Sequence, residues 1–375
     1  MHARRSTDAV AKAALVQRRL VSYHPAPFGI KSGPGGRSSN SGITATVFGA
    51  YGFVGRYFVD ELGKRGSRVY IPYRGCEMEI RHLKPMFDLG QLGLMPFSPR
   101  DRESICEAVK KSDVVINMIG KHYETKHIVP TRRADGNLSR VNYDFEEVNV
   151  TIPRILAEIS KEAGVESFIH VSALSADLES KSKWSRTKAQ GELAVREAFP
   201  EAIIVKPATI FGPEDRFLNW IAETTSRLPF FPLIENGQTL VQPISATDVG
   251  KALMAIVDRH DEFEGKTFQL VGPAEYSFKE VAEYVSDVTS VKKHLINVPT
   301  PLAAKVGSFV EQLVQPVLTE DHIAQLREDV LPQQDKGYLG MQDLDLTPVS
   351  MDRVAFEFLH RFRPGGHFQL VKGYH

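Results

Sequence analysis

The amino-acid sequence predicts an α/β protein: a doubly wound parallel Rossmann sheet with a smaller C-terminal α+β region. An apolar, β-branched strand over residues 43–48 leads into three evenly spaced glycines and then into an amphipathic helix. Short apolar strands and longer helical segments then alternate as far as residue 213. This alternation is typical of a parallel sheet with helices on both faces.

The glycine turn has the spacing of a dinucleotide-binding turn, Gly-x-x-Gly-x-x-Gly. Gly49 permits the sharp turn off the strand, Gly52 lets the backbone approach a pyrophosphate, and Gly55 lets the helix pack closely. The first N–H groups of the helix would face the phosphates. An ordinary strand–helix turn is the alternative. The residues expected to bind a cofactor here are Gly49, Tyr51, Gly52, Phe53, Val54 and Gly55.

A second strand is expected over residues 67–73, and Arg74 follows it directly. NAD-binding units usually carry an acidic residue at this position for the ribose 2′-hydroxyl, whereas a basic residue accommodates a 2′-phosphate. Arg74 therefore predicts NADPH rather than NADH, unless it is only a solvated loop arginine.

The remaining elements follow from the same patterns. Residues 114–120 are almost wholly apolar, as a parallel strand buried on both faces should be. A Pro- and aromatic-rich loop is expected over residues 228–232. The other expected strands are 94–97, 168–172, 202–206 and 266–271, and the expected helices are 102–110, 145–163, 184–198, 216–227, 248–258 and 277–288.

The two ends of the chain do not follow this alternation. Residues 1–21 are rich in arginine, with Asp8 as the only acid, which favours a mitochondrial presequence over a basic disordered tail. Residues 22–42 are rich in Gly, Pro and Ser and predict a flexible lead-in. Residues 301–318 show apolar side chains at helical spacing, typical of either a core helix or an interfacial helix against a membrane or partner. The tail from residue 333 is poorly patterned, and we expect it to lie on a partner.

Composition limits the function classes. The 375 residues carry a formal net charge of +0, which gives no electrostatic basis for binding nucleic acid. Two cysteines, Cys76 and Cys106, indicate a reducing compartment without a disulfide framework. No apolar run reaches the roughly 18–20 residues that a transmembrane helix needs. His122 and His127 have no further ligand cluster beside them, so no metal site is expected.

Between residues 44 and 271 the chain resembles the extended or atypical short-chain dehydrogenase/reductase (SDR) superfamily. Besides the glycine turn, the resemblance rests on Asp113-Val114-Val115-Ile116-Asn117, Val148-Asn149-Val150, His170-Val171-Ser172-Ala173-Leu174, Lys188 with Gly191-Glu192, the segment 206–213 and the segment 244–249. The transit-like start, Tyr73-Arg74-Gly75 and the segment 343–348 are, more narrowly, similar to a family of NADPH-binding accessory subunits of mitochondrial complex I.

One position decides what the resemblance implies about catalysis. Active SDR enzymes carry Tyr-x-x-x-Lys and an upstream serine, and the phenol exchanges a proton with the substrate. This chain has Trp184 in place of the tyrosine, while Lys188 and Ser172 are present. An indole N–H donates a hydrogen bond but exchanges no proton near neutral pH. The resemblance therefore implies no catalytic residue, and Lys188 is expected to bind the ribose hydroxyls of the cofactor.

Two further positions stay open. A displaced acid would be sought among His122, Tyr123, Glu124 and Tyr143. Many SDR proteins place an Asp after the third strand to hold the adenine, whereas Ser98 stands at that position in this chain.

The resemblance implies a non-catalytic complex I subunit that binds NADPH as a structural cofactor, peripheral on the matrix side of the mitochondrial inner membrane. The implied partners are other complex I subunits at the matrix arm near the membrane, with lipid contact at the membrane surface, no nucleic acid and no transmembrane segment. The expected division is a presequence (1–21), a lead-in (22–42), an NADP-binding Rossmann domain (43–213) and a C-terminal region with a docking tail (214–375). Two alternatives remain: an active NADPH-dependent reductase or epimerase for a sugar nucleotide or hydrophobic carbonyl, and an RNA-binding or chaperone-like SDR protein.

Overall fold

The computed structural model describes residues 31, 33, 35–124, 130–132, 138–140, 143–310, 318–333 and 336–364, with the backbone alone for 130–132, 138–140 and 309–310. The expected presequence, residues 1–21, lies outside these ranges. Within them, no helix is long and apolar enough to cross a membrane.

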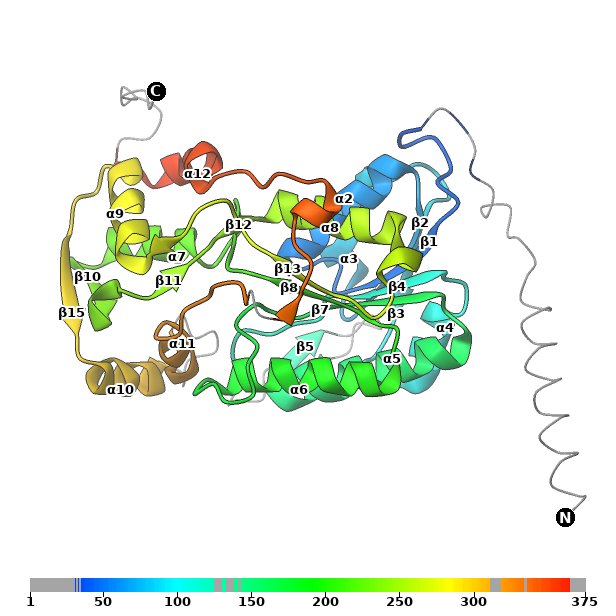
Figure 1. Ribbon diagram of the computed structural model, residues 1–375, viewed down its shortest axis with the longest axis horizontal. Helices are drawn as coiled ribbons and strands as arrows, with labels where there is room; N and C mark the ends of the chain where they lie inside the picture. Colours follow the sequence, from blue (N-terminus) through cyan, green and yellow to red (C-terminus); the bar gives the residue numbers. More distant parts are fainter. Residues whose placement is uncertain are drawn as a thin grey trace, which may run out of the picture.

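Seven parallel strands form the central sheet, in the order β13-β8-β7-β4-β1-β2-β3 (Figure 1). The chain winds outward from β1 first to one side and then to the other, so the order reverses between β1 and β4, and ligands of such sheets bind outside the carboxyl ends at this point. This confirms the doubly wound Rossmann sheet. Its strands are β1 (Thr44–Phe48), β2 (Arg68–Tyr73), β3 (Leu92–Pro96), β4 (Val114–Asn117), β7 (Ser167–Val171), β8 (Ile203–Pro207) and β13 (Thr267–Leu270).

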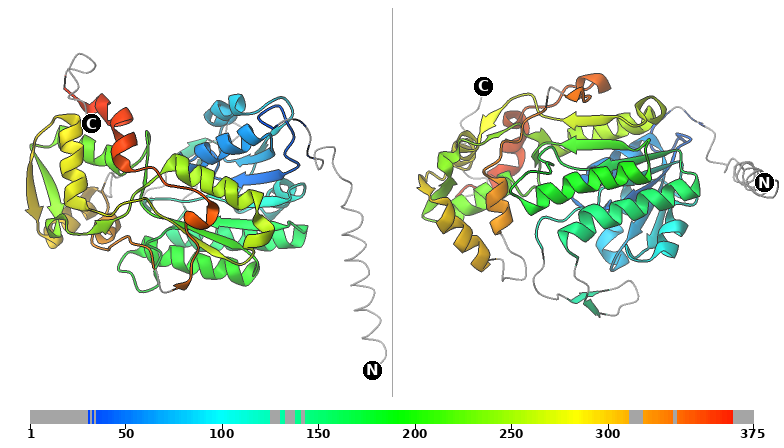
Figure 2. Two further views of the ribbon diagram at one scale, coloured as in Figure 1. Left: turned by 45° about the horizontal axis from the view of Figure 1, so that its top comes forward. Right: turned by 60° about the horizontal axis from the view of Figure 1, so that its bottom comes forward.

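Helices cover both faces of the sheet. On one face, α2 (Phe53–Arg65) and α8 (Ala246–Asp258) lie side by side (Figure 1). On the other face, α5 (Ile152–Ala163) and α6 (Lys183–Ala198) run together beside α4 (Arg102–Val109) (Figure 2). Each face buries its own apolar cluster against the sheet. The expected helix 145–163 begins with a π-helical turn, η2 (Glu147–Thr151), before α5.

A smaller lobe stands beyond the carboxyl ends of the strands, at the left of Figure 1. Three of its helices enclose an apolar cluster of their own: α7 (Leu218–Arg227), α9 (Phe278–Thr289) and α12 (Met351–Leu359). Its outer part consists of β10 (Phe230–Ile234), β15 (His294–Val298), α10 (Thr300–Val310) and α11 (Glu320–Gln325). The remaining elements are short: α3 (Glu77–Ile80), η1 (Arg81–Met86), β5 (Pro130–Arg132), β6 (Leu138–Arg140), β9 (Ile210–Phe211), η3 (Glu235–Gly237), β11 (Leu240–Val241), β12 (Ile244–Ser245), η4 (His260–Phe263), β14 (Tyr276–Ser277), η6 (Gln342–Leu344) and η7 (His360–Phe362).

The expected loop over residues 228–232 is wrong, because most of it belongs to strand β10. Phe231 and Leu233 point into the small-lobe core and are almost fully buried. β10 pairs in parallel with β15 in a two-stranded sheet. Pro232 is tolerated because a strand with one hydrogen-bonded neighbour need not donate from every N–H.

The expected domain boundary at residue 213 does not separate the two lobes. Strand β13 pairs with β8 inside the central sheet, and α8 packs against α2, although both elements follow residue 213. The chain leaves the Rossmann layer to begin the small lobe and returns to add its last strand. The Rossmann core therefore extends to about residue 270, in agreement with the span of the SDR resemblance.

The tail also differs from its expectation over residues 336–364. Helix α12 buries Met351, Ala355 and Leu359 in the small lobe. Before it, the backbone of Leu339 pairs with strand β13, accepting from Gln269 N at 2.8 Å and donating to Thr267 O at 3.0 Å. This part of the tail completes the chain's own core and sheet edge, because its apolar residues have matching surfaces within the chain.

The last residues of the expected flexible lead-in are likewise held by the domain. The side-chain amide of Gln91 donates to the carbonyl oxygens of Arg37 and Ser39, at 2.7 and 3.2 Å. Ser39 is buried. A segment whose carbonyls are bonded in this way is part of the fold, so the lead-in expectation is wrong from about residue 37 onward.

Candidate nucleotide-binding site

The glycine turn after β1 has the geometry that its spacing predicts. Gly49 adopts φ +81°, and a Cβ there would lie 2.7 Å from the carbonyl oxygen of Met118. A Cβ at Gly55 would lie 2.5 Å from the carbonyl oxygen of Ala50. These two glycines are therefore required by the protein's own packing, since neither contact can be relieved by moving a side chain.

Gly52 differs from its two neighbours. It precedes the first turn of α2 as the N-cap residue, its N–H donates to Gly49 O at 3.0 Å, and it is exposed. Having no side chain, it cannot cap the free N–H groups of the helix, which stay available to an anion. A Cβ at Gly52 would meet only Gly49 O, at 3.2 Å. The open space beside it fits the approach of a pyrophosphate.

The side chains between the glycines brace the turn. Tyr51 is half-buried, and burial raises the pKa of its phenol while the charge of Arg74 opposes the rise. Val54 packs against the Rossmann core. Phe53 lies edge-on to Tyr57, with ring centroids 5.9 Å apart, and close to Gly212 of the opposing loop.

Arg74 stands exposed at the end of β2, where the 2′-phosphate was predicted to bind. Its guanidinium carbon lies 4.9 Å from the centroid of the Tyr143 ring. It makes no ion pair with a carboxylate in the part of the chain that the structure describes. An unpaired guanidinium at this strand end fits a phosphate group.

Lys188 lies in α6 and is buried. Burial lowers the pKa of its ammonium to about 8, and Glu192 opposes the fall. Its Nζ lies 5.8 Å from the Trp184 ring centroid and 3.8 Å from where a Cβ of Gly120 would be. Among the described residues it has no hydrogen-bond acceptor, so ribose hydroxyls would supply one that the protein does not.

The two groups next to the expected reaction centre are engaged elsewhere. The indole N–H of Trp184 donates to the backbone carbonyl of Lys121 at 2.8 Å. The hydroxyl of Ser172 donates to Glu192 Oε1 at 2.5 Å, and the other oxygen of Glu192 accepts from the buried Lys206 at 3.2 Å. Sequence reasoning missed this Ser172–Glu192–Lys206 network, although the Gly191-Glu192 motif was a signal for it.

The candidate displaced acids lie in unfavourable states or places. Glu124 accepts from Lys183 Nζ at 2.7 Å and from Phe145 N at 2.9 Å, and hydrogen bonds to these groups lower the pKa of its carboxyl despite its partial burial. Although His122 is partly exposed to solvent, loss of water around its imidazole lowers the pKa to about 4, and the charges of Arg216 and Lys188 add to this fall. At pH 7 the ring is therefore neutral and has no imidazolium proton to donate.

Tyr143 was a candidate displaced acid, and Ser98 concerned the adenine contact. The ring of Tyr143 is buried beside Arg74, at the end of β2. Ser98, which replaces the adenine-holding Asp, is exposed, and its carbonyl oxygen accepts from Asp101 N at 3.0 Å. Ser98 therefore shapes the turn before α4, and the adenine contact remains a prediction without a named residue.

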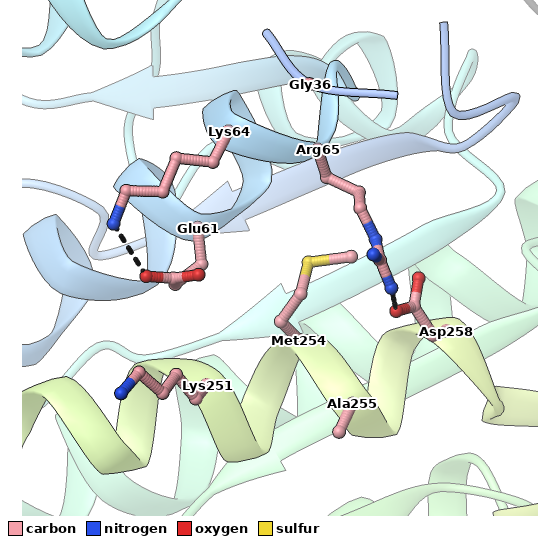
Figure 3. A pocket seen from close by; sticks show the side chains of 8 residues that line it. All are labelled: Gly36, Glu61, Lys64, Arg65, Lys251, Met254, Ala255 and Asp258. Atoms are coloured by element: carbon pink, nitrogen blue, oxygen red, sulfur yellow. Dashed lines mark hydrogen bonds and ion pairs between the residues drawn. The ribbon is translucent and has the colours of Figure 1, made fainter. Parts of the chain in front are cut away.

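Two surface cavities lie away from this site. One, of about 310 Å³, lies between α2 and α8 (Figure 3), where Arg65 pairs with Asp258 and Lys64 with Glu61. Another, of about 500 Å³, adjoins β13 and the tail near Tyr338. Neither touches the glycine turn, and the ion pairs of the first leave its charges compensated. Within the described ranges, no group of three or more His, Cys, Asp or Glu is placed to hold a metal ion.

Comparison with known proteins agrees with the geometry. Residues 45–270 match the NAD dependent epimerase/dehydratase family. The chain is 43% identical over 341 residues to mouse NADH dehydrogenase (ubiquinone) 1 alpha subcomplex subunit 9, mitochondrial, covering 89% of this chain and 84% of that one. It is 40% identical over 346 residues to the Arabidopsis thaliana protein of the same name, covering 90% and 82%.

Among solved structures, a dTDP-glucose 4,6-dehydratase from Streptomyces venezuelae, crystallised with NAD and TYD, superimposes with a TM-score of 0.62 at 16% identity, covering 85% of this chain and 96% of that one. That likeness concerns the fold. The family match and the high identity to the mouse and plant proteins place the sequence more narrowly. The chain belongs to the NAD dependent epimerase/dehydratase family and, within it, to the family of the mitochondrial NADH dehydrogenase (ubiquinone) 1 alpha subcomplex subunit 9.

Proposed function

We propose that this chain is an accessory subunit of mitochondrial respiratory complex I that binds NADPH firmly and does not turn it over. The names of its relatives support the assembly. The rest of the proposal rests on one contrast within the site. The positively charged side chains that would bind a nucleotide have no carboxylate or hydrogen-bond acceptor among the described residues, whereas the side chains at the proton-transfer positions are already hydrogen-bonded within the chain.

The binding half of this contrast rests on three features. The first turn of α2 offers N–H groups beside the exposed Gly52. Arg74 offers an unpaired guanidinium to a 2′-phosphate, and Lys188 offers a buried ammonium to the ribose. Together these residues would hold NADPH along the carboxyl ends of β1, β2 and β4, with Gly49, Tyr51, Phe53, Val54 and Gly55 shaping the turn. A bound nicotinamide would supply hydride chemistry to an enzyme of this fold.

The non-catalytic half rests on Trp184 and Ser172. Trp184 has no titratable proton, and its N–H is bonded to Lys121 O rather than directed at a substrate. Ser172 is bonded to Glu192, so it cannot orient a carbonyl without breaking a short, charge-assisted hydrogen bond. Without an acid or an orienting hydroxyl, hydride transfer lacks the proton that must accompany it.

A structural role for the nucleotide follows from linkage. A ligand that binds only the folded state stabilises it by RT ln(1 + [L]/Kd), about 4 kcal/mol at a thousandfold excess over Kd. The glycine turn, β2 and α6 would all contact the same ligand, so its binding would lock three parts of the Rossmann layer together.

We further propose that the subunit is peripheral on the matrix side of the inner membrane, at the matrix arm, with lipid contact through the small lobe. Ile296 of β15 and Leu302 and Val306 of α10 are among the exposed large apolar side chains. Residues 288–310 contain lysines but no carboxylate. An apolar, basic surface of this kind suits an anionic membrane. The expected helix 301–318 is seen as α10 up to Val310, and residues 311–317 lie outside the described ranges.

The experiment is made on purified complex I. Bound nucleotide is extracted in acid and in base and identified by chromatography, and oxidation of bound NADPH is followed during NADH:quinone turnover. We expect NADP(H) at close to one per complex, unchanged through many turnovers. Recovery of NAD(H) alone would refute the choice of nucleotide. Oxidation of the bound NADPH at the turnover rate would refute the structural role and support the reductase alternative.

A further inference from the structure

Two guanidinium groups meet at one buried aromatic ring. Arg74 comes from the end of β2, and Arg100 comes from the loop between β3 and α4. Their Cζ atoms lie 4.9 and 4.7 Å from the centroid of the Tyr143 ring. The tyrosine is 6% exposed, whereas both arginines are exposed. The ring is therefore a fixed support on which two flexible side chains rest.

The ring is held by its own surroundings. Tyr143 packs in the apolar cluster between the sheet and helices α4, α5 and α6. Its carbonyl oxygen accepts from Lys121 Nζ at 2.9 Å. A side chain fixed at both backbone and ring can orient a neighbour without moving itself.

The two arginines differ in how their charge is balanced. Arg100 forms a two-point contact with Glu147, from Nε at 2.5 Å and from Nη2 at 2.7 Å. Arg74 has no carboxylate partner among the residues that the structure describes. Two like charges at one ring would repel, and Glu147 offsets one of them. Arg74 is therefore the cation of this pair that is left to meet an anion.

The cluster adjoins the glycine turn. β2 pairs in parallel with β1, so Arg74 after β2 and the glycine turn after β1 leave the same edge of the sheet on neighbouring strands, and the Tyr143 ring lies against Arg74. The ring therefore lies at the adenosine end of the proposed site, where the 2′-phosphate of NADPH distinguishes it from NADH.

We propose that Tyr143 is a positioning residue that sets nucleotide selectivity by holding the Arg74 guanidinium toward the 2′-phosphate, with Arg100 and Glu147 completing the support. The inference rests on the proposed binding of NADPH. A solvated arginine without the ring would sample many rotamers, and ordering one of them on binding would weaken the phosphate contact. Cation–π contact at an exposed guanidinium favours the ordered rotamer in advance.

The test uses the full chain freed of nucleotide, with Kd measured for NADPH and NADH on each variant. Tyr143→Leu removes the ring face, Tyr143→Phe keeps it, and Arg74→Ala removes the cation. We expect Tyr143→Leu to weaken NADPH roughly fivefold, the loss of an exposed cation–π contact, and to leave NADH unchanged. Tyr143→Phe should bind both nucleotides like the parent chain. In the Arg74→Ala background, Tyr143→Leu should cause no further loss of NADPH affinity.

The outcomes separate this inference from the function on which it rests. Equal weakening of NADPH and NADH in Tyr143→Leu would show that the ring serves the core only and would overturn the inference. An Arg74→Ala chain that binds NADPH like the parent would instead refute the proposed nucleotide selectivity. Folding of each variant is checked separately, by its thermal unfolding without nucleotide. If Tyr143→Leu shows no cooperative unfolding transition, Tyr143→Met, which fills a similar length without a ring face, takes its place with the same expected result.

Discussion

The indole N–H of Trp184 donates to the backbone carbonyl of Lys121 across 2.8 Å, joining the start of α6 to the loop that follows β4. The same junction holds an ion pair between Lys183 and Glu124 at 2.7 Å. Where an SDR enzyme would present a phenol to its substrate, this chain has a structural hydrogen bond. The indole therefore fixes the shape of the site at this position, and it has no titratable proton to transfer near neutral pH.

Two substitutions of Trp184 test its structural hydrogen bond and its lack of a titratable proton separately. Trp184→Phe removes the hydrogen bond and should lower the free energy of unfolding by about 1 kcal/mol, as measured by urea denaturation. Trp184→Tyr restores a phenol, but Ser172 stays bonded to Glu192, so we expect no oxidation of NADPH with a panel of sugar-nucleotide and hydrophobic carbonyl substrates. Multiple turnovers by Trp184→Tyr would mean that an open substrate pocket persists and that one substitution had silenced an enzyme.

Substitutions of two glycines in the turn should have different effects, one on nucleotide binding and the other on stability. Gly52→Val places a branched side chain in the open space beside the helix N-terminus, and we expect loss of nucleotide with a smaller loss of stability. Gly55→Ala places a Cβ 2.5 Å from Ala50 O, which forces the backbone apart and should destabilise the apo chain by roughly 1–3 kcal/mol. Nucleotide content after purification and thermal unfolding without nucleotide distinguish the two. A Gly52→Val chain that retains full occupancy would show that the pyrophosphate does not approach this turn.

The lowered pKa of Lys188 predicts that nucleotide binding depends on pH. Its pKa is about 8 in the folded chain, so the ammonium loses its proton as the pH rises through 8. NADPH affinity should fall between pH 7 and 9, because the neutral amine no longer attracts the anionic nucleotide. Lys188→Met should bind more weakly at pH 7 and show no such fall. A parallel decline in both chains would assign the effect to another group.

The same shift has a stability consequence of defined sign. Between the folded pKa of about 8 and the ordinary lysine pKa of 10.5, only the unfolded chain binds this proton. Stability of the apo chain contributed by Lys188 therefore rises with pH in that window, by up to about 1.4 kcal/mol per pH unit. Below pH 8 both states are protonated, and the group contributes no slope.

Two carboxylates of the small lobe accept hydrogen bonds from the start of α6 and the residues just before it. Asp321 accepts from Lys183 N at 2.6 Å and from Ser182 Oγ at 3.0 Å, while Glu328 accepts from Ser180 Oγ at 2.7 Å and from Lys181 N at 2.9 Å. Asp321→Asn keeps an acceptor but removes the charge that favours a helix N-terminus, and should cost about 1 kcal/mol of unfolding free energy. Glu357→Gln, an exposed site on α12, is the matched control. Equal free energies of unfolding for the two variants in urea would contradict a stabilising role for the charge of Asp321.

The sequence was sufficient for the Rossmann layer because each strand there has a local signature. The Gly49 turn and the apolar run from Val114 carry their structure in a few adjacent residues. Strands β10 and β15 have no such signature. Pro232 argues against a strand, and His294 and Asn297 break the alternation of β15, so these strands are recognisable only from their pairing with each other.

The site shows the same division. Gly52, Arg74 and Lys188 occupy motif positions, which is why the sequence predicts a binding role for them. The contact between Arg100 and Tyr143, and that between Glu192 and Lys206, join residues whose sequence separation is unrelated to any repeat. Such pairs arise because helices and loops pack beside strands and loops from other parts of the sequence, and neither partner signals the other in the sequence.

The bond between Leu339 and strand β13 has a consequence for how the molecule is completed. The outer edge of β13 is covered by residues about seventy positions further along the chain. A chain that emerges or is threaded amino end first carries an uncovered, hydrogen-bonding sheet edge until almost its full length is available, and such edges invite pairing with other chains. A copy that ends before Leu339 keeps that edge open. Closure of this sheet edge thus requires the chain to extend at least to the segment around Leu339.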